Sequence, residues 1–236
     1  MAGEPSAAGA HDLPVGEALP DWTPPHHPGR EPMKGRYCRL EPLDAEQHAT
    51  GLFEAFARDT EGTDWTYLPY GPFATEAALE SWLAEMSRTD DPLFFTILDA
   101  EGRAVGVASY LRIDPAVGSI EVGHIHYSPL LQRTRAATEA MYLMARRVFD
   151  ELGYRRYEWK CDDLNAPSRA AAERLGFTYE GTFRKHRIYK GRNRDTAWYS
   201  ITDSEWPAIR QAMEAWLDPS NFDESAKQRT RLEARK

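Results

Sequence analysis

The sequence predicts a single α/β domain built on a mixed sheet. Strand patterns dominate its first half, a strand–helix–strand crossover follows, and a short helix and a long hairpin complete the pattern. With 236 residues, of which 42% are hydrophobic, the chain is long enough to bury one substantial core. We therefore expect one globular domain and no second large one.

Both ends of the chain differ in composition from its middle. Residues 1–34 are expected to form a Pro-rich arm, because seven of the sixteen prolines fall there and such a segment buries little apolar surface. Trp22 either anchors this arm on the body or stays in solvent. Residues 35–217 are assigned to the domain and residues 218–236 to a charged tail, which we expect to be loose.

The first half of the domain alternates between strand and helix patterns. Its aromatic loop, DWTYLPYGPF, is too rich in large side chains to be a mere spacer, and Gly123 in its last strand suggests a β-bulge or a close backbone approach. The expected elements are a strand at 35–43, a helix at 44–57 capped by Asp44, the aromatic loop at 64–73, a helix at 75–86, a hairpin of strands at 91–99 and 104–114, and a strand at 119–128.

The second half is organised by a crossover helix that starts at Thr134 and ends near Gly153. Ala137, Ala140, Met141, Met144 and Val148 give this helix one apolar face. A right-handed crossover would place residues 128–136 at the carboxyl end of a strand, where α/β sheets bind ligands. The remaining expected elements are a strand at 154–162, a short helix at 166–177, two strands within 177–202 and a helix from about 204.

Composition excludes several classes of protein. The formal net charge of −8 argues against a chain that works mainly by neutralising nucleic-acid phosphate. No run of eighteen apolar residues is present, and the N-terminus lacks the basic and apolar regions of a signal peptide. Cys38 and Cys161 lack the spacing of a zinc or redox site. We expect a cytoplasmic protein with free thiols and no membrane contact.

Two motifs carry the chemical interpretation. QRTRAA, at 132–137, opens the crossover helix, whose unpaired N–H groups suit a pyrophosphate. Asn165-Ala166-Pro167-Ser168 is followed by Gly176-Phe177 and Glu180-Gly181. Together these motifs resemble the GNAT superfamily of acyl-CoA-dependent N-acyltransferases, and within it the group that acetylates the N-termini of ribosomal proteins. The resemblance covers roughly residues 35–203.

The resemblance implies a mixed, mostly antiparallel central sheet flanked by helices, with acetyl-CoA as co-substrate. It also implies that the backbone around Ile125, His126 and Tyr127 pairs with the pantetheine arm like an added strand, and that Asn165 contacts the cofactor. The pyrophosphate loop would comprise Gln132, Arg133, Thr134, Arg135, Ala136, Ala137 and Thr138.

Arg135 departs from the family pattern, because it stands where the family has glycine. A left-handed arginine would cost about 1–2 kcal/mol, so the sequence implies either an adjusted loop or an ion pair that offsets the strain. Ser168 is the family's candidate proton donor to the departing thiolate, although a serine at a helix start can equally be a cap or a packing residue. Cys161 is expected to be a buried, inert thiol beside this site.

The strand SIEVGHIHY offers two candidate general bases, Glu121 and His124. Period-2 alternation puts Glu121 on one face with Ile125 and Tyr127, and His124 on the other with His126, unless a bulge changes the phase. We prefer Glu121 as base, the alternative being a structural ion pair, and His124 is its competitor. His124 and His126 have no evident third ligand nearby, so no metal is expected.

The expected activity is acetyl transfer to a primary amine, either a peptide N-terminus or a small amino compound, with the aromatic loop as part of the acceptor wall. The alternative is a non-catalytic CoA-binding or nucleic-acid-binding module. The basic segment RKHRIYKGRNR is the best case for nucleic acid, yet we prefer a solvated hairpin, with contact with an acidic substrate or the CoA phosphate as the next alternative. We do not expect a nucleic-acid partner, and a homodimer is left open.

Overall fold

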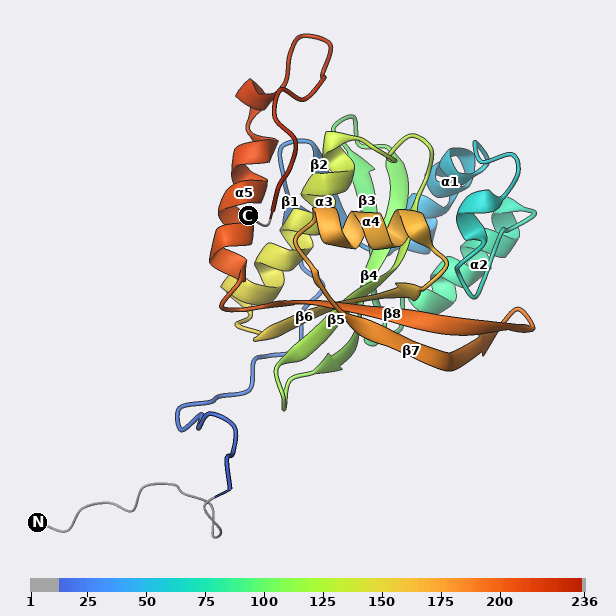
Figure 1. Ribbon diagram of the computed structural model, residues 1–236. Helices are drawn as coiled ribbons and strands as arrows, with labels where there is room; N and C mark the ends of the chain where they lie inside the picture. The colour runs from blue at the N-terminus through green and yellow to red at the C-terminus, as the bar shows by residue number, and fades with distance from the viewer. Residues whose placement is uncertain (1–12, 235–236) are drawn as a thin grey trace, which may run out of the picture.

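A computed structural model describes residues 13–234 and contains an eight-stranded sheet with helices on both faces (Figure 1). The strand order is β1-β2-β3-β4-β5-β6-β8-β7, in which only the β5–β6 pair is parallel. This confirms the predicted mixed, mostly antiparallel α/β fold. The strands are β1 (Met33–Lys34), β2 (Cys38–Pro42), β3 (Leu93–Asp99), β4 (Ala104–Asp114), β5 (Ser119–Tyr127), β6 (Arg156–Asp162), β7 (Thr178–Tyr189) and β8 (Arg192–Thr202).

The helices divide between the two faces of the sheet. On β3, Phe94 packs into a cluster with residues of α1 and α2, whereas its neighbour Phe95 packs into a cluster with residues of α3, α4 and α5. We call these the α1 face and the α3 face. The helical segments are α1 (Ala45–Phe56), α2 (Glu76–Met86), α3 (Arg135–Arg146), α4 (Ala166–Arg174) and α5 (Trp206–Leu217), the 3₁₀ turns η1 (Thr63–Trp65) and η3 (Pro219–Asn221), and the π-helical turn η2 (Arg147–Glu151).

Side-chain caps start the helices where the sequence predicted them. Asp44 accepts a hydrogen bond from the Gln47 N–H, and Thr134 accepts one from the Ala137 N–H. Each cap satisfies one of the N–H groups that an α-helix leaves unpaired in its first turn. The predicted starts of α1 and α3 are therefore confirmed, and the start of α3 fixes the loop before it.

The described part of the Pro-rich arm is anchored on the body. Trp22 Nε1 donates to the Ala116 carbonyl at 3.3 Å, and Arg147 of η2 donates to the Glu31 and Pro32 carbonyls. Of the two alternatives for Trp22, anchoring is the one observed. Residues 1–12 of the predicted arm lie outside the described residues.

The expectation of a loose tail after Asp218 was wrong for the part that the structure describes. Phe222, Leu232 and Ala234 are buried, and Trp216 Nε1 donates to Gln228 Oε1 at 2.9 Å. A few apolar side chains hold the segment against α5 although charged residues dominate its sequence. Residues 235 and 236 lie outside the described residues.

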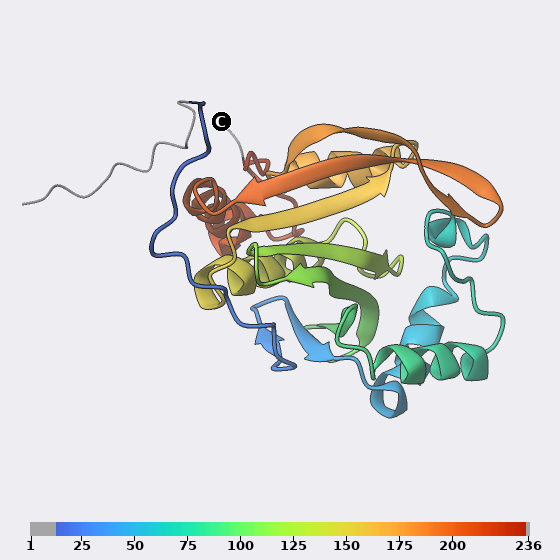
Figure 2. The same cartoon turned by 90° about the horizontal axis from the view of Figure 1, so that it is seen from below.

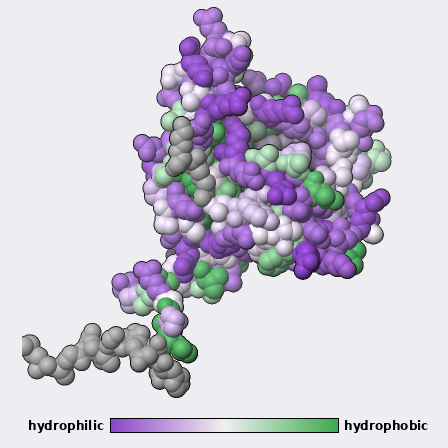
Figure 3. Space-filling view, in the orientation of Figure 1, coloured by the Kyte–Doolittle hydropathy of each residue, from purple (hydrophilic) through white to green (hydrophobic). Residues whose placement is uncertain are grey.

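Hydrophilic residues dominate the molecular surface in the orientation of Figure 1, with hydrophobic ones in scattered patches (Figure 3). Seen from below, the β7–β8 hairpin extends across the molecule and its tip lies beside the segment around η1 (Figure 2). Lys190 Nζ at this tip donates to the Trp65 carbonyl at 2.9 Å. The hairpin tip and the aromatic loop are therefore in direct contact.

Candidate active site

The two parallel strands at the centre of the sheet separate part-way along their length. β5 and β6 pair from Ser119 with Arg156 to Val122 with Trp159, and no pairing between them continues beyond that point. A cleft of about 1460 Å³ lies where they part, and residues from both faces of the sheet line it. The divergence leaves the β6 side of the last residues of β5 without a strand partner.

A β-bulge in β5 changes which side chains face each way. Against β4, Ser109 pairs with Gly123 but Val107 pairs with His126, so one extra residue is inserted at 124–125. His124 takes a left-handed conformation there, with φ of 50°. The bulge predicted at this strand is confirmed, and it overturns the face assignment from simple alternation.

After the bulge, Ile125 and Tyr127 pack against the α3-face core, whereas the His126 ring contacts Trp65 and Phe56 on the α1 face. Val122 is buried on the α3 face, so the adjacent Glu121 points to the α1 face, the side on which His124 packs. Glu121 therefore shares a face with His124, not with Ile125. Both candidate bases lie on the same side of the cleft.

The loop before α3 is strained at a different arginine from the one expected. Arg133 is the left-handed residue, with φ of 61°, and Arg135 is the first residue of α3 in ordinary helical geometry. The left-handed residue therefore lies immediately before Thr134, whose side chain caps the helix by accepting from the Ala137 N–H. Of the two explanations for Arg135, the adjusted loop is the one observed, and within residues 13–234 Arg135 forms no ion pair that could offset strain.

Arg135 is held by aromatic rings. Its guanidinium carbon lies 4.6 Å from the ring centroids of both Tyr37 and Phe222. Cation–π contacts of this kind hold a guanidinium in place while leaving its N–H edge free to donate. Tyr37 precedes β2 and Phe222 follows η3, so residues from both ends of the chain position this arginine.

Other loop residues are held by direct hydrogen bonds. Gln132 Nε2 donates to Asp64 Oδ2 at 2.7 Å and to the Tyr127 carbonyl at 2.9 Å, which ties the loop to β5 and η1. Thr138 Oγ1 accepts from Arg174 of α4 at 3.1 Å. The predicted site residues that line the cleft are Glu121, His124, Ile125, His126, Tyr127, Gln132, Arg133, Thr134, Arg135, Ala137, Thr138, Asn165 and Ser168. Ala136 instead packs against the core.

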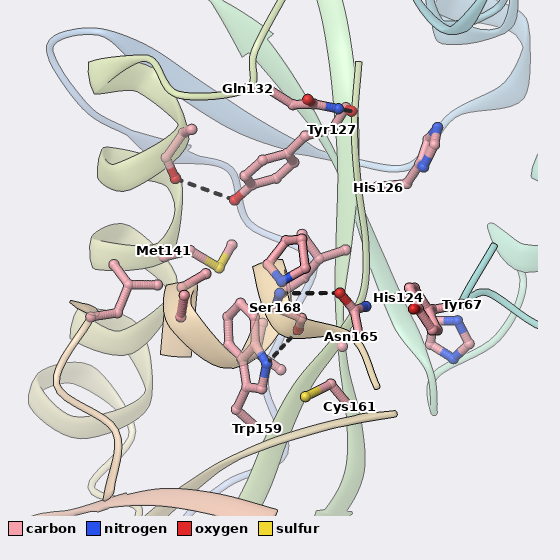
Figure 4. Close-up of a pocket in the computed structure, with 18 of the residues that line it drawn as sticks. Tyr67, His124, His126, Tyr127, Gln132, Met141, Trp159, Cys161, Asn165 and Ser168 are labelled. Carbon is pink, nitrogen blue, oxygen red and sulfur yellow. Dashed lines mark hydrogen bonds between the residues drawn. The ribbon is translucent and has the colours of Figure 1, made fainter. Parts of the chain in front are cut away.

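The second motif places a serine hydroxyl between α4 and β6 (Figure 4). Asn165 is the cap of α4, because its Oδ1 accepts from the Ser168 N–H at 3.1 Å, so the cap alternative for the Ser168 side chain is wrong. Ser168 Oγ accepts from Trp159 Nε1 at 3.0 Å. Burial raises the pKa of the neighbouring Cys161 thiol, against a smaller opposing effect of its hydrogen bond with Ser168. Cys161 is therefore buried, as predicted, and its raised pKa favours the less reactive thiol form.

Glu121 is held in a buried network of charges. Its carboxylate lies 2.6 Å from Arg112 Nη1 and 2.9 Å from Lys160 Nζ, and the Glu121 and Lys160 side chains are 4% and 5% exposed. Lys160 also contacts Glu158 at 2.6 Å and lies 3.7 Å from the Trp198 ring centroid. The ion pairs named as the alternative role for Glu121 do form, and they fix its carboxylate at the cleft.

Both strand histidines are kept neutral by burial. Burial, and to a smaller extent Arg112, lowers the pKa of His124 to about 4, and its Nδ1 lies 3.0 Å from the Tyr70 hydroxyl. Burial lowers the pKa of His126 to about 3, and its ring lies 3.6 Å from the Trp65 ring centroid. His126 is therefore part of the aromatic core on the α1 face, and only its backbone is suited to a ligand role.

Several residues of the cleft were missed from the sequence. Arg112 and Lys160 surround Glu121, and Tyr189 donates to Asp162 Oδ2 at 2.7 Å. Lys160 lies between Trp159 and Cys161 in a predicted strand, and because a buried charge needs a partner, it could have indicated an ion pair at this position. No local pattern could have paired it with Glu121, because β5 and β6 are separated by the crossover.

No helix within residues 13–234 is long and apolar enough to cross a membrane. In the same described part of the chain, no group of three or more His, Cys, Asp or Glu side chains is arranged to hold a metal ion.

Parallel central strands that separate beside the N-terminus of a helix leave an unpaired strand edge next to free N–H donors, an arrangement that suits an extended ligand with a phosphate group. The family model described as "Acetyltransferase (GNAT) domain" matches residues 38–178, so the chain belongs to the GNAT acetyltransferase family and is an N-acetyltransferase. The crystal structure of a GCN5-related N-acetyltransferase from Brucella melitensis is 52% identical, with a TM-score of 0.89 over 91% of this chain and 97% of that one.

Two further relatives extend this comparison. A Chromobacterium violaceum protein described as a "probable" GNAT-family acetyltransferase is 42% identical, with a TM-score of 0.76 over 83% of this chain and 98% of that one. The "Putative ribosomal N-acetyltransferase YdaF" of Bacillus subtilis (strain 168) is 25% identical over 169 residues, which cover 71% of this chain and 90% of that protein.

Proposed function

We propose that this enzyme transfers the acetyl group of acetyl-CoA directly to a primary amine, either a protein N-terminus or a small amino compound. One observation carries the proposal: the cleft between β5 and β6 is lined from both faces of the sheet. Residues such as Ser168 and Met141 line it from the α3 face, and Glu121 and His124 from the α1 face. Two substrates can therefore approach from opposite faces and meet where the strands part.

The α3-face half fits acetyl-CoA. The N–H groups of Arg135 and Ala136, in the first turn of α3, precede the first intrahelical hydrogen bonds and can donate to a pyrophosphate. Arg133, Arg135 and Arg174 line the same region and supply positive charge. The β6 side of residues 125–127 is left without a strand partner and can pair with the pantetheine amides. Acetyl-CoA would supply the acetyl thioester.

Glu121 is our choice to remove the proton from the attacking amine, through a water molecule. An α-ammonium group has a pKa of about 8, so little driving force is needed near neutral pH. The Glu121 carboxylate is at the cleft, and Arg112 and Lys160 fix its direction. His124 remains the competing base, because burial lowers its pKa to about 4 and so keeps its imidazole neutral near pH 7.

Ser168 is suited to return a proton to the departing sulfur. The Trp159 indole N–H only donates, so Ser168 Oγ accepts from Trp159, and its own O–H, which lies beside the Cys161 thiol, would turn from that sulfur to the departing one. Backbone N–H groups of β5 beyond Val122 can stabilise negative charge on the acetyl oxygen while the amine attacks. The amine nitrogen gains the acetyl group, Glu121 or its water takes one proton, and the sulfur receives another.

A thiol-release assay with acetyl-CoA tests this proposal. The acceptor panel comprises amino acids, polyamines, aminoglycosides and peptides that begin with Ala or Ser. The description of the Bacillus subtilis relative as a ribosomal acetyltransferase supports including the peptides. We expect thiol release with at least one amine, together with a mass increase of one acetyl group on that amine. Acetyl-CoA binding by calorimetry without release on any acceptor would favour the non-catalytic alternative, and no binding would refute the proposal.

A further inference from the structure

Two arginines lie directly opposite each other at the acceptor end of the cleft. Arg187 of β7 pairs with Arg194 of β8, and both side chains line the cleft. Residues paired in this way project from the same face of an antiparallel sheet, and like charges in such a pair repel each other. The hairpin therefore holds two cations together at some energetic cost.

Neither guanidinium contacts a carboxylate in the described part of the chain. Arg187 makes no side-chain hydrogen bond or ion pair there, and the only one to the Arg194 guanidinium is from Nε to Thr196 Oγ1, at 3.2 Å. Two carboxylates of the same region, Asp162 at the cleft and Asp195 next to Arg194 in the sequence, have other partners. Asp162 accepts from the Tyr189 hydroxyl and the Leu164 N–H, and Asp195 accepts from the Lys185 N–H and Asn193.

This contrasts with Arg156 in the same sheet, which binds Glu158 at 2.7 Å and makes a two-pronged contact with Glu180. Arg156 thus has carboxylate partners within the sheet, whereas Arg187 and Arg194 have none among the described residues. An arginine pair that faces a cavity without a carboxylate is poised to bind an anion from solution.

Further cations approach the same point. Arg112 and Lys160 line the cleft on this side and both contact the Glu121 carboxylate, and Lys160 also contacts Glu158, which does not line the cleft. The pKa of His186 is lowered by burial and, to a smaller extent, by the charges of Arg187, Arg194, Arg112 and Lys160. Among the described residues, the cleft is lined by seven Arg or Lys side chains and three Asp or Glu, although the chain as a whole has a net charge of −8.

We propose that the acetyl acceptor carries an anionic group, a carboxylate or a phosphate, separate from its reacting amine, and that Arg187 and Arg194 bind this group. The inference rests on the proposed function and names its substrate class. Binding the anion on the hairpin relieves the repulsion between the two arginines and directs the amine toward Glu121 and the point where β5 and β6 part. In this arrangement Arg133 and Arg135, at the start of α3, would bind the pyrophosphate of acetyl-CoA.

Matched pairs of acceptors test this inference. O-phosphoethanolamine is compared with ethanolamine, 4-aminobutyrate with its amide, and the peptide Ser-Glu-Ala-amide with Ser-Gln-Ala-amide, all by thiol release from acetyl-CoA. We expect the anionic member of at least one pair to be preferred about tenfold to hundredfold in kcat/KM. The pair that shows the preference distinguishes carboxylate from phosphate and a small amine from a peptide.

The variants Arg187→Gln and Arg194→Gln should remove this preference mainly by raising KM for the anionic acceptor, with acetyl-CoA affinity unchanged. Arg184→Gln is the matched control, because Arg184 is exposed on the same strand and does not line the cleft. Equal use of both members of every pair, or equal effects of all three variants, would overturn the inference while leaving the proposed function intact.

A binding measurement keeps the inference testable if no acceptor releases thiol. Inorganic phosphate is titrated into the full chain and into the Arg187→Gln/Arg194→Gln variant by calorimetry, with acetyl-CoA saturating the donor half. We expect weak binding that is lost in the double variant. Absence of binding to the unaltered chain, or unchanged binding in the double variant, contradicts an anion site at the hairpin. Displacement of acetyl-CoA by phosphate would assign the arginines to the donor instead.

Discussion

The two halves of the cleft are built in different ways. On the α3 face, short continuous segments supply the site: the loop and first turn of α3, and the start of α4 with its cap. On the α1 face, the site is assembled from β4, β5, β6, the aromatic loop and the β7–β8 hairpin, and buried ion pairs hold it together. A short local motif is enough to specify the proposed acetyl-CoA half. The proposed amine-binding half depends on contacts between distant segments, so it can vary without changing the loop before α3.

Among substitutions that test this difference between the two halves of the cleft, we expect the largest loss of kcat at Glu121. We expect Glu121→Gln to lower kcat by about 10²- to 10⁴-fold, because it removes the proposed proton acceptor. Glu158→Gln is the control, since it breaks the other ion pair of Lys160 but does not line the cleft. Steady-state thiol release and thermal unfolding are measured for both. Equal losses of activity and stability in the two variants would assign Glu121 a structural role only.

On the donor side, Ser168→Ala is expected to lower kcat by about 10- to 100-fold while acetyl-CoA affinity stays the same. In the proposed mechanism the hydroxyl acts only when the sulfur departs. Trp159→Phe removes the donor to Ser168 but keeps the hydroxyl, so its effect should be several-fold smaller. A loss of acetyl-CoA affinity on calorimetry that parallels the loss of kcat would instead indicate a binding or packing role for Ser168.

The buried histidines on the α1 face should make the free energy of unfolding depend on pH. Because the folded pKa of His126 is lowered to about 3, the unfolded chain takes up this proton first on acidification. The stability contribution is complete above pH about 6.5 and is lost as the pH falls toward 3, at about 1.4 kcal/mol per pH unit between those values.

His126→Phe should therefore lose less free energy of unfolding between pH 6.5 and 5, by about 1–2 kcal/mol, in urea titrations. His26→Gln, which alters an exposed histidine, is the control and should keep the slope of the unaltered chain. Parallel slopes for His126→Phe and the unaltered chain would show that His126 does not drive the dependence.

A smaller effect is expected from the aromatic support of Arg135. Phe222→Ala removes one of the two rings that flank its guanidinium and should weaken CoA binding about threefold to tenfold in calorimetry. Phe183→Ala is the control, because Phe183 is an exposed aromatic residue on β7 that does not line the cleft. Unchanged affinity in Phe222→Ala would mean that the C-terminal segment does not contribute to the donor half.

The smallest expected effect is at the strained arginine. Arg133→Gly should be more stable than Arg133→Gln by about 0.5–1 kcal/mol, because both variants lose the charge but only glycine relieves the left-handed conformation. Urea unfolding measures the difference. A more stable glutamine variant would show that strain at this residue is negligible.

Particular residues show how far sequence reasoning reached. Asp44 was recognised as a helix cap, and the helix start at Thr134 was read from the apolar spacing that follows it. The crossover and the 165–168 motif located the cleft because they too depend on spacings within short stretches of chain. Face assignments in β5 failed beyond Gly123, since alternation is reliable only until a bulge inserts a residue. The C-terminal segment was misjudged because Phe222 and Leu232 are few among many charges.

The sequence by itself determined the order of the elements, the mixed sheet, the family and the loop at the start of α3, because each depends on spacings within a short stretch of chain. Only the tertiary structure decided that Glu121 is held by Arg112 and Lys160, that the left-handed residue is Arg133, and that Arg187 and Arg194 are paired on the hairpin and both line the cleft. Those features depend on strand register and on the packing of distant segments. A one-residue change of register alters them while leaving the local sequence pattern unchanged.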